Sequence, residues 1–415
     1  MPHILHITPH LGGGVGKALL GLASGDTTNT HVILTLDYAN AAALEYAKAN
    51  SVPIFPEKHA DPQCIADAVT CADIVVIHFW NHPLLYHLVV NQTLPPARIA
   101  FWSHVSGLFP PYTFPDRMLA YPDRFVFTTR KSCQADPVVR FEGSNKFHVI
   151  RSLGGVACAQ TVGPQKKSGF VVGYVGTVDY AKMHPDYIQI HKSLTIPGIR
   201  FLIVGGDSER AVAAEADTRF TFTGKVPDVS PYMAQMDVFG YLLNRRHYGT
   251  AEQALQEAMA AGVVPVVLNN AAESDLVTHG KTGLVATTIE EYKQYITHLH
   301  TDAALRCELA KNAKEYAQKN FSSQRMLDEW NTVYDAMMTV PKRSRRYGVG
   351  PLSPFELFLE SLGESRCLFE GQDERSIQTV LAQSEWQSFS KGSPRQYLAF
   401  FPLDRHLGEL ALLYD

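Results

Sequence analysis

Residues 247–262, HYGTAEQALQEAMAAG, lie between two apolar runs, Val238–Leu243 and Val263–Leu268. The runs predict two buried strands, and the segment between them predicts a tight turn followed by a helix. Parallel α/β sheets use this order of strand, turn, helix and strand to hold anionic ligands. The segment therefore indicates both a fold class and a kind of ligand.

The start of this helix carries the local signals of an anion site. Thr250 and Gln253 have the spacing of a capping box, which predicts that the helix begins at Ala251. Gly249, directly before the cap, has no Cβ and lets the backbone approach a ligand. The first N–H groups of the helix lie at the positive end of its dipole, which suits a phosphate or diphosphate.

Two carboxylates of the same segment point in different directions. Glu252 and Glu257 are five residues apart, about 140° around a helix with ~100° per residue. We expect Glu252 at the ligand end and Glu257 a turn and a half deeper. The alternative is that Glu252 only complements the helix dipole and that Glu257 is solvated.

Length and composition favour a soluble protein with two domains. The 415 residues exceed one hydrophobic core, and a net charge of -4 argues against a nucleic-acid-binding protein. The apolar runs are too short to span a bilayer and no secretory leader opens the chain, so we expect a cytoplasmic protein. Six cysteines without metal-site spacing predict reduced, mostly buried thiols.

Strands and helices alternate along the chain, which predicts two doubly wound α/β domains with a cleft at the carboxyl ends of their strands. The strands expected in the first half are His3–Thr8, His31–Leu36, Ile74–Ile77, Ile99–Trp102 and Arg124–Thr128. The strands expected in the second half are Phe170–Val175, Arg200–Val204, Arg219–Phe222, Val238–Leu243 and Val263–Leu268. After Gly12–Gly16 we expect a helix near Lys17–Ser24, and Leu153–Lys167 predicts the linker between the halves.

The last third of the chain is less informative. Ala303–Gln318 and Ser323–Met338 predict two amphipathic helices that close the second domain. The basic run Lys342–Arg346 predicts a solvated linker, with contact to an acidic membrane surface or nucleic acid as the alternative. We therefore expect domains at residues 1–160 and 161–340, and an extension without a chemical motif at residues 341–415.

Five short motifs occur together in one known family. They are Gly13-Gly14-Val15 with Lys17, Phe101-Trp-Ser-His104, Phe222-Thr-Gly-Lys-Val226 with Tyr232–Val238, Glu257-Ala-Met-Ala-Ala-Gly262, and Ala272–Val285. This set resembles the GT-B glycosyltransferases, and within them the retaining glycosyltransferase family 4 (glycosyl transferases group 1). The resemblance covers roughly residues 1–340 and is most specific at 170–290.

The resemblance implies a retaining glycosyltransferase. Its second domain would bind a UDP- or GDP-linked sugar donor, and its first would bind a carbohydrate, peptide or small-molecule acceptor. Glu257 would hold the donor ribose, backbone groups near Val226 would hold the base, and Lys182 would neutralise the diphosphate. Lys182 and the helix start at Thr250 and Ala251 are fixed positive partners for a departing diphosphate.

The first domain would contribute two further elements. Gly13 and Gly14 would let a loop approach the leaving phosphate, and His104 would lie near the donor sugar and the reaction centre. No D-x-D sequence occurs, so we expect no metal and no cofactor beyond the nucleotide sugar. His78, His82 and His87 lack nearby acids, which favours packing or a ligand cleft over a metal site.

Three departures from the family pattern affect the donor site. Gly249 stands where the family has its first glutamate, so either Glu252 takes over contact with the sugar hydroxyls or that contact is absent. Thr177 stands where the family has a phosphate-binding arginine, and Arg245 or Arg246 is the candidate replacement. The aromatic and glycine positions that follow the family's first glutamate are also changed. Two rival functions follow: another GT-B nucleotide-sugar enzyme, such as an epimerase, or a degenerate module that binds without catalysis.

Overall fold

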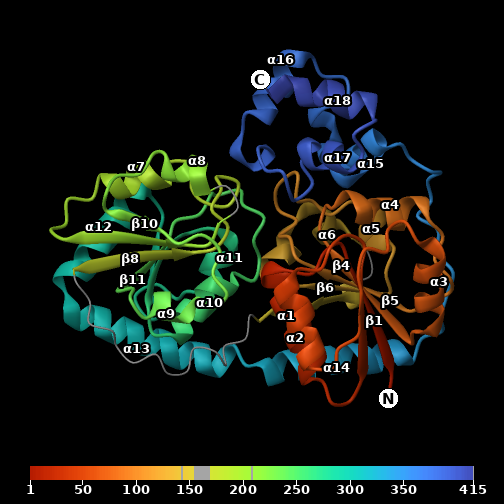
Figure 1. Cartoon of the computed structure of the whole chain (residues 1–415), viewed down its shortest axis with the longest axis horizontal. Coiled ribbons are helices and arrows are strands. Elements are labelled where there is room, and N and C mark those ends of the chain that lie inside the picture. The colour runs from red at the N-terminus through yellow and green to blue at the C-terminus, as the bar shows by residue number, and fades with distance from the viewer. Residues whose placement is uncertain (142–143, 154–168, 207–208, 415) are drawn as a thin grey trace. The chain divides into compact units, whose positions relative to one another are not determined.

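The structure is a computed structural model that describes residues 1–141, 144–153, 169–206 and 209–414. Backbone contacts divide the chain into two units, which can be followed by colour in Figure 1. Unit 1 comprises residues 1–152, 248–251 and 323–415, and unit 2 comprises residues 153–247 and 252–322. The linker expected at Leu153–Lys167 lies, apart from Leu153 itself, outside the described residues.

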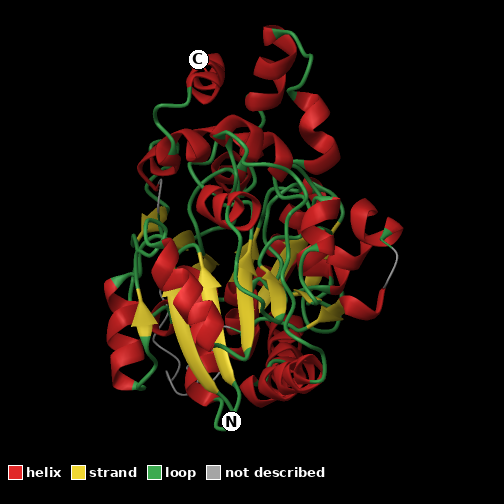
Figure 2. Cartoon of the chain, turned by 90° about the vertical axis from the view of Figure 1, so that its right-hand side faces the viewer, coloured by secondary structure: helices red, strands yellow, loops and turns green. Residues whose placement is uncertain are grey.

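Unit 1 is built on a seven-stranded parallel sheet with the order β3-β2-β1-β4-β5-β6-β7. Figure 2 shows helices on both sides of these strands. The strands are β1 (His3–Thr8), β2 (Thr30–Thr35), β3 (Ile54–Phe55), β4 (Ile74–Phe79), β5 (Ile99–Ser103), β6 (Arg124–Phe127) and β7 (Phe147–Val149). The five expected strands are confirmed within two residues at each end, whereas β3 and β7 are too short to give a sequence pattern.

The helices of unit 1 come from both ends of the chain. They are α1 (Gly13–Gly25), α2 (Ala41–Ala49), α3 (Pro62–Cys71), α4 (Pro83–Asn91), α5 (Asp116–Ala120), α6 (Asp136–Arg140), α14 (Ser323–Met338), α15 (Pro354–Ser361), α16 (Glu374–Leu381), α17 (Pro394–Phe400) and α18 (Arg405–Ala411). Asn40 and Asp61 begin α2 and α3 by accepting backbone N–H bonds from Ala43 and Cys64. Helix α1 begins at Gly13, four residues before the expected start, because the glycine-rich turn is itself its first turn.

The last third of the chain belongs to unit 1. Helix α14 packs against α1 and β4, and its Trp330 lies on Trp102 with 4.9 Å between ring centroids. Helices α15 and α17 pack against α4, and Trp386 and Tyr397 join the apolar core of the sheet. The observed division therefore differs from the expected one: α14 covers unit 1 instead of closing unit 2, and the extension completes the unit 1 core.

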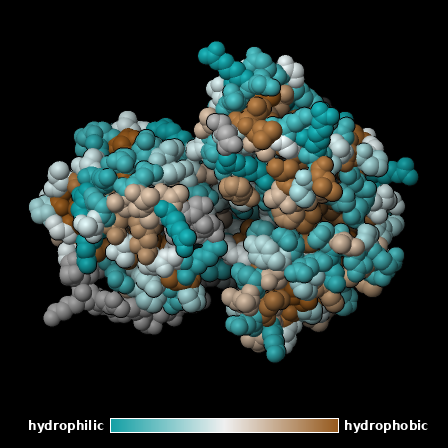
Figure 3. Space-filling model, turned by 45° about the horizontal axis from the view of Figure 1, so that its top comes forward, coloured by the Kyte–Doolittle hydropathy of each residue, from teal (hydrophilic) through white to brown (hydrophobic). Residues whose placement is uncertain are grey.

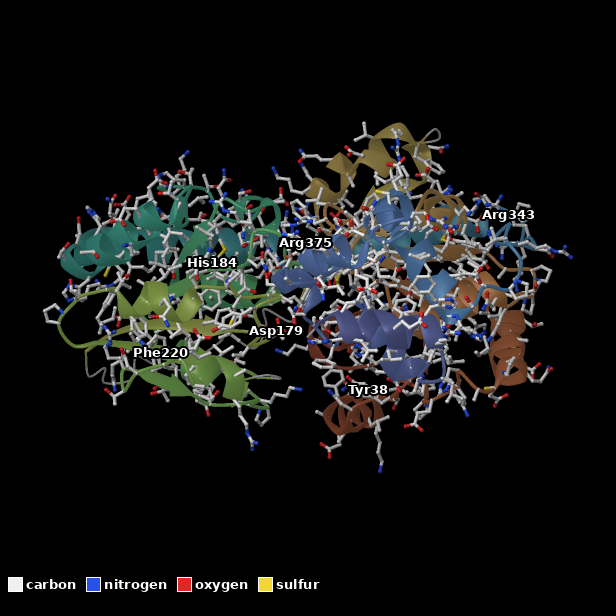
Figure 4. All side chains as sticks on the ribbon, turned by 90° about the horizontal axis from the view of Figure 1, so that it is seen from above. Tyr38, Asp179, His184, Phe220, Arg343 and Arg375 are labelled. Carbon is white, nitrogen blue, oxygen red and sulfur yellow. The ribbon has the colours of Figure 1, made fainter. Side chains whose placement is uncertain are left out.

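The basic run at 342–346 is bound to the sheet. Lys342 Nζ donates to the carbonyl of Ala72 at 2.6 Å, and Arg343 (labelled in Figure 4) pairs with Asp123 at 3.0 Å. Arg345 is a second partner of the Asp123 carboxylate. The expected linker is thus only partly solvated: Arg343 and Arg346 are exposed, whereas Lys342 and Arg345 are half-buried against a backbone carbonyl and a buried carboxylate.

Unit 2 is built on a six-stranded parallel sheet with the order β10-β9-β8-β11-β12-β13. Its strands are β8 (Phe170–Val175), β9 (Ile199–Val204), β10 (Phe220–Phe222), β11 (Val238–Tyr241), β12 (Val264–Leu268) and β13 (Leu284–Ala286). Its helices are α7 (Tyr187–Lys192), α8 (Glu209–Ala213), α9 (Ser230–Met233), α10 (Gln253–Ala260), α11 (Ala271–Ser274), α12 (Ile289–Thr301) and α13 (Ala303–Asn320). The five expected strands are confirmed, and two doubly wound parallel sheets establish the predicted α/β class.

The surface corrects one further expectation. The five described cysteines are free, but Cys71, Cys133, Cys307 and Cys367 are exposed, so the prediction of mostly buried thiols is wrong. Within the described residues, no helix is both long and apolar enough to cross a membrane. Hydrophilic side chains cover most of the face drawn in Figure 3.

We predict that Trp330→Ala destabilises unit 1 by about 3–5 kcal/mol, because it leaves a cavity between α14 and the sheet. All four tryptophans, Trp80, Trp102, Trp330 and Trp386, belong to unit 1, so tryptophan fluorescence during urea unfolding reports on this unit alone. The control is Met338→Ala, whose side chain on the same helix is 36% exposed. Equal fluorescence midpoints for the two variants would contradict the assignment of α14 to unit 1.

Candidate functional site

Each unit has one point where the strand order reverses. In unit 1 this point lies between β1 and β4, and in unit 2 between β8 and β11. Loops that leave neighbouring strands in opposite directions open a crevice at the carboxyl ends, where ligands of doubly wound sheets bind. His10 and Trp80 follow β1 and β4, and Lys182 and His247 follow β8 and β11.

Lys182 is buried in unit 2 and bound to a carboxylate. Its side chain is 8% exposed, and its Nζ lies 2.7 Å from both carboxylate oxygens of Glu252. Tyr241 donates its hydroxyl to Oε2 of Glu252 at 2.6 Å. A turn closed by Asp179 (labelled in Figure 4), whose carboxylate accepts the Lys182 N–H at 2.9 Å, holds the lysine in place.

A second carboxylate continues this cluster. His247 lies 3.4 Å from Lys182 through Nδ1 and 3.0 Å from Oε2 of Glu273 through Nε2. Asn270 donates to the other oxygen of Glu273 at 2.8 Å. We call Lys182, Tyr241, His247, Glu252 and Glu273 the Lys182 cluster. It joins the loops after β8, β11 and β12 into one buried polar network.

The turn before α10 differs from its prediction. The helix begins at Gln253, and Glu252 precedes it in a left-handed conformation (φ 43°) without a side-chain cap. The predicted capping box is wrong, because the hydroxyl of Thr250 bonds to that of Thr128 at 2.5 Å instead. Gly249, Thr250 and Ala251 belong to unit 1, whereas Glu252 belongs to unit 2.

Glu252 is therefore a buried partner of Lys182 and not a helix-dipole residue at the surface. Burial alone would raise the pKa of the Glu252 carboxyl, but the charge of Lys182 and its hydrogen bonds hold that pKa below its ordinary value. Burial and the same carboxylate raise the pKa of Tyr241, which keeps its phenol protonated. The pair thus maintains one positive and one negative charge away from water.

The other expected donor residues of unit 2 lie in the loops after β8, β10 and β11 and on α10. The carbonyl of Thr177 accepts the Tyr174 hydroxyl at 2.6 Å, and Glu257 is half-buried on α10. Val226 is half-buried in the loop after β10. Arg245 is exposed and donates to the carbonyl of Thr287 at 2.8 Å, so in this structure its guanidinium contacts backbone. The roles of these residues in donor binding remain predictions.

In unit 1, His104 follows β5 and lies among aromatic rings. Its imidazole stacks on His78 with 5.2 Å between centroids and contacts Trp80 edge-on at 6.0 Å. His10 also contacts Trp80 and His82, and it stacks on Tyr38 (labelled in Figure 4), with the two rings parallel at 5.1 Å. These side chains line the carboxyl ends of β1, β4 and β5.

The predicted phosphate loop of unit 1 is open. Gly13 and Gly14 are exposed, and a Cβ at Gly13 would meet nothing within 4 Å. The positive φ of Gly13 (58°) favours glycine at this position. The backbone is therefore exposed at this turn, and its approach to a leaving phosphate remains a prediction.

The extension brings one cation to the same aromatic rings. Lys391 Nζ lies 5.1 Å from the ring centroid of Trp80 and 5.0 Å from that of Tyr248. The neighbouring Gly392 packs so closely that a Cβ there would lie 2.7 Å from Asn81. Glycine at this position therefore lets the extension place Lys391 beside the rings.

A row of hydrogen-bonded imidazoles leads from Asp26 to His104. We call His31, His6, His78 and His104 the histidine row. Successive contacts measure 3.0 Å (Asp26–His31), 2.9 Å (His31–His6), 3.1 Å (His6–His78) and 2.9 Å (His78–His104). Each step moves one strand across the sheet and two residues toward the carboxyl ends. Helix α14 covers this face, since Trp330 contacts Trp102 and Tyr334 contacts His31.

Sequence reasoning missed several of these residues. Asp26, His6 and His31 received no role, and neither did Tyr241 and Lys391. The signal for the row was a histidine in or just after each of four expected strands. Only the order and register of these strands in the sheet bring the rings together. For Lys391, no signal was present, because its position depends on how the extension folds.

We predict that Lys182→Met destabilises unit 2 by about 3–5 kcal/mol, because the buried Glu252 carboxylate loses its partner. Far-ultraviolet circular dichroism during urea unfolding should reveal the loss, while the tryptophan signal of unit 1 stays unchanged. Adding Glu252→Gln should restore part of the stability. Lys311→Met is the control, since Lys311 is 75% exposed and pairs with Glu315 at 3.9 Å. A loss as small as that of the control would contradict a stabilising ion pair between Lys182 and Glu252.

We also predict that unit 1 loses stability as the pH falls below about 6.5, the usual pKa of histidine in an unfolded chain. Burial lowers the pKa values of His6 and His78 well below this value, so the unfolded chain binds protons that the folded chain does not. Each such ring costs about 1.4 kcal/mol per pH unit once it is charged only in the unfolded state. Urea midpoints from tryptophan fluorescence at pH 7.5 and 5.5 test this, and His6→Gln must show a shallower pH dependence.

Comparisons with known proteins agree with this architecture. Residues 169–302 match the family described as Glycosyl transferases group 1. GDP-Man:Man(3)GlcNAc(2)-PP-Dol alpha-1,2-mannosyltransferase of Dictyostelium discoideum is 33% identical over 97 residues, which are 22% of this chain and only 19% of that protein. The putative glycosyltransferase YtcC of Bacillus subtilis (strain 168) is 25% identical over 331 residues, or 70% of this chain and 79% of that protein.

A solved structure is similar over most of the chain. The crystal structure of Anabaena HepE in complex with UDP-glucose superposes with a TM-score of 0.65 at 15% identity, and covers 81% of this chain and 100% of that one. The likeness establishes the fold, and the family match falls on unit 2. The chain therefore has the GT-B fold, and residues 169–302 are similar to the Glycosyl transferases group 1 family.

Proposed function

We propose that the protein is a glycosyltransferase that moves a sugar from a nucleoside diphosphate to an acceptor hydroxyl. One observation carries the proposal: the family match at 169–302 contains the Lys182 cluster and Glu257, at the strand-order reversal of unit 2. Buried charges in fixed positions at such a point suit a ligand whose own charge grows during reaction. The acceptor is a carbohydrate, a peptide or a small molecule.

Two nucleotides are candidates for the donor. HepE, which is similar in fold, was solved with UDP-glucose, and the Dictyostelium relative is named for GDP-mannose. Both support a sugar linked to a nucleoside diphosphate and leave UDP and GDP as alternatives. In our proposal Glu257 holds the ribose, and Gly13 and Gly14 approach the leaving phosphate.

We further propose retention of configuration without a metal. The leaving phosphate would face the amino end of α10 and the positive charge of Lys182. It would take the proton of the acceptor hydroxyl, which attacks the sugar on the same face from which the phosphate leaves. Glu252 would weaken the interaction of Lys182 with the diphosphate, because the Lys182 ammonium group already donates to both carboxylate oxygens of Glu252. Nucleotide binding would then require the diphosphate to compete with Glu252 for the Lys182 ammonium group.

This pairing is also the observation that favours a module that binds without catalysis. A lysine engaged by a carboxylate neutralises a diphosphate less well. An epimerase-like enzyme is the other alternative, and it would convert the nucleotide sugar when no acceptor is present. Product analysis of the donor alone separates this activity from transfer.

We predict that at least one nucleotide sugar raises the melting temperature of the protein. A ligand at about 100 times its Kd adds about 2.7 kcal/mol to the stability of the folded state. A thermal-shift screen with UDP-glucose, UDP-N-acetylglucosamine, GDP-mannose, UDP and GDP tests this. Glu257→Ala should abolish the shift, whereas Glu308→Ala, an exposed carboxylate on α13, should preserve it. A screen without any shift would overturn the proposed function.

A further inference from the structure

The histidine row of unit 1 is linked head to tail. Nε2 of His31 faces Asp26, and Nε2 of every later ring faces Nδ1 of the ring before it. A neutral imidazole has one proton, so it donates from one nitrogen and accepts at the other. Once the proton of one ring lies on Nε2, the ring next to it must also have its proton on Nε2, and the same holds for Nδ1.

Asp26 provides the fixed end of the row. Its Oδ1 accepts the backbone N–H and the hydroxyl of Thr28 at 2.8 Å and 2.7 Å, and its Oδ2 accepts Nδ2 of Asn29 at 2.7 Å. Burial would raise the pKa of Asp26, but these hydrogen bonds and that of His31 hold it well below its ordinary value. An ionised carboxylate can only accept, so the proton of His31 must lie on Nε2.

The rings of the row are neutral. Burial lowers the pKa values of His6 and His78 well below the ordinary value, and it lowers that of His31 despite the neighbouring Asp26. Burial and the charge of Lys391 lower the pKa of His104 to about 3. Tyr334, the other titratable side chain against His31, also stays neutral, because burial raises its pKa.

We propose that Asp26 is a positioning residue that acts through His31, His6 and His78 to hold His104 with a proton on Nε2 and a lone pair on Nδ1. Among the described residues, Nδ1 of His104 has no hydrogen-bond partner. The ring lies at the carboxyl end of β5 beside Trp80. Its ligand is then a group that donates a hydrogen bond, such as a hydroxyl of the sugar substrate. This assignment of the ligand rests on the proposed function, whereas the direction of the row does not.

Asp26→Asn tests the direction. An asparagine has one acceptor oxygen, which the N–H groups of Thr28 and Asn29 require, so its NH₂ would face Nε2 of His31. Every ring would then exchange its donor and acceptor nitrogens, and His104 would have its proton on Nδ1. Nitrogen-15 NMR of histidine-labelled protein distinguishes protonated from unprotonated ring nitrogens. The His104 signals are assigned by their absence in His104→Gln.

The control is Asp73→Asn, which removes a carboxylate at the amino end of β4 that accepts the N–H of His3 at 2.9 Å and does not belong to the row. We expect the Nε2–H form of His104 in the unmodified protein and in the control, and the Nδ1–H form in Asp26→Asn. A His104 proton on Nδ1 in the unmodified protein, or the same form in all three proteins, would overturn the proposal.

Ligand affinity tests the assignment of a sugar hydroxyl. Asp26→Asn should weaken binding of UDP-glucose or GDP-mannose about tenfold, since a donor would face a donor, but should leave UDP or GDP binding unchanged. Isothermal titration measures both. If His104 carries its proton on Nδ1 in Asp26→Asn but the affinity for the nucleotide sugar is unchanged, the assignment of a sugar hydroxyl as the ligand is refuted. The proposed direction of the row then still holds. Failure of the unmodified protein to bind any nucleotide sugar would refute the proposed function, while the NMR result would still decide the direction of the row.

Discussion

The buried ion pair between Lys182 and Glu252 determines the shape of the unit 2 site. Removing both charges from water is costly, and the cost is offset only when every remaining hydrogen-bonding position is filled. Tyr241 and the second carboxylate oxygen meet this requirement at 2.6 Å and 2.7 Å. The same contacts stabilise the left-handed backbone of Glu252, which by itself costs on the order of 1–3 kcal/mol. The loop after β8 and the start of α10 therefore stabilise each other through this ion pair.

Unit 1 meets the problem of buried polar groups in another way. Instead of opposite charges, it buries four neutral imidazoles that hydrogen-bond to one another. One carboxylate, that of Asp26, accepts the hydrogen bond at the end of the row. Neutral hydrogen-bonded groups are less costly to bury than ions. The arrangement requires the rings to follow the register of the sheet, and α14 must cover them. Both requirements depend on contacts between residues far apart in the sequence.

Most of the strands were predictable because they are short, largely apolar runs, which are typical of strands buried on both faces. The start of α10 was not predictable, because the spacing of Thr250 and Gln253 fits a capping box and only the fold brings Thr128 to the hydroxyl of Thr250. The amphipathic pattern of α14 was correct, but an apolar face does not specify which sheet it covers. For the candidate site, the family resemblance predicts roles for Lys182 and His104, and the pattern of the 247–262 segment predicts one for Glu252, whereas only tertiary contacts reveal the partners of these residues.

The extension is part of the candidate site and not an appendix to it. Trp386 and Tyr397 lie in the same core as the sheet, so residues 341–415 cannot leave without exposing apolar surface of unit 1. The close approach of Gly392 to Asn81 then gives Lys391 its place against Trp80 and Tyr248. A cation at this position disfavours a second proton on His104 and His10. The extension thus contributes to the neutral state of the rings on which the direction of the histidine row depends.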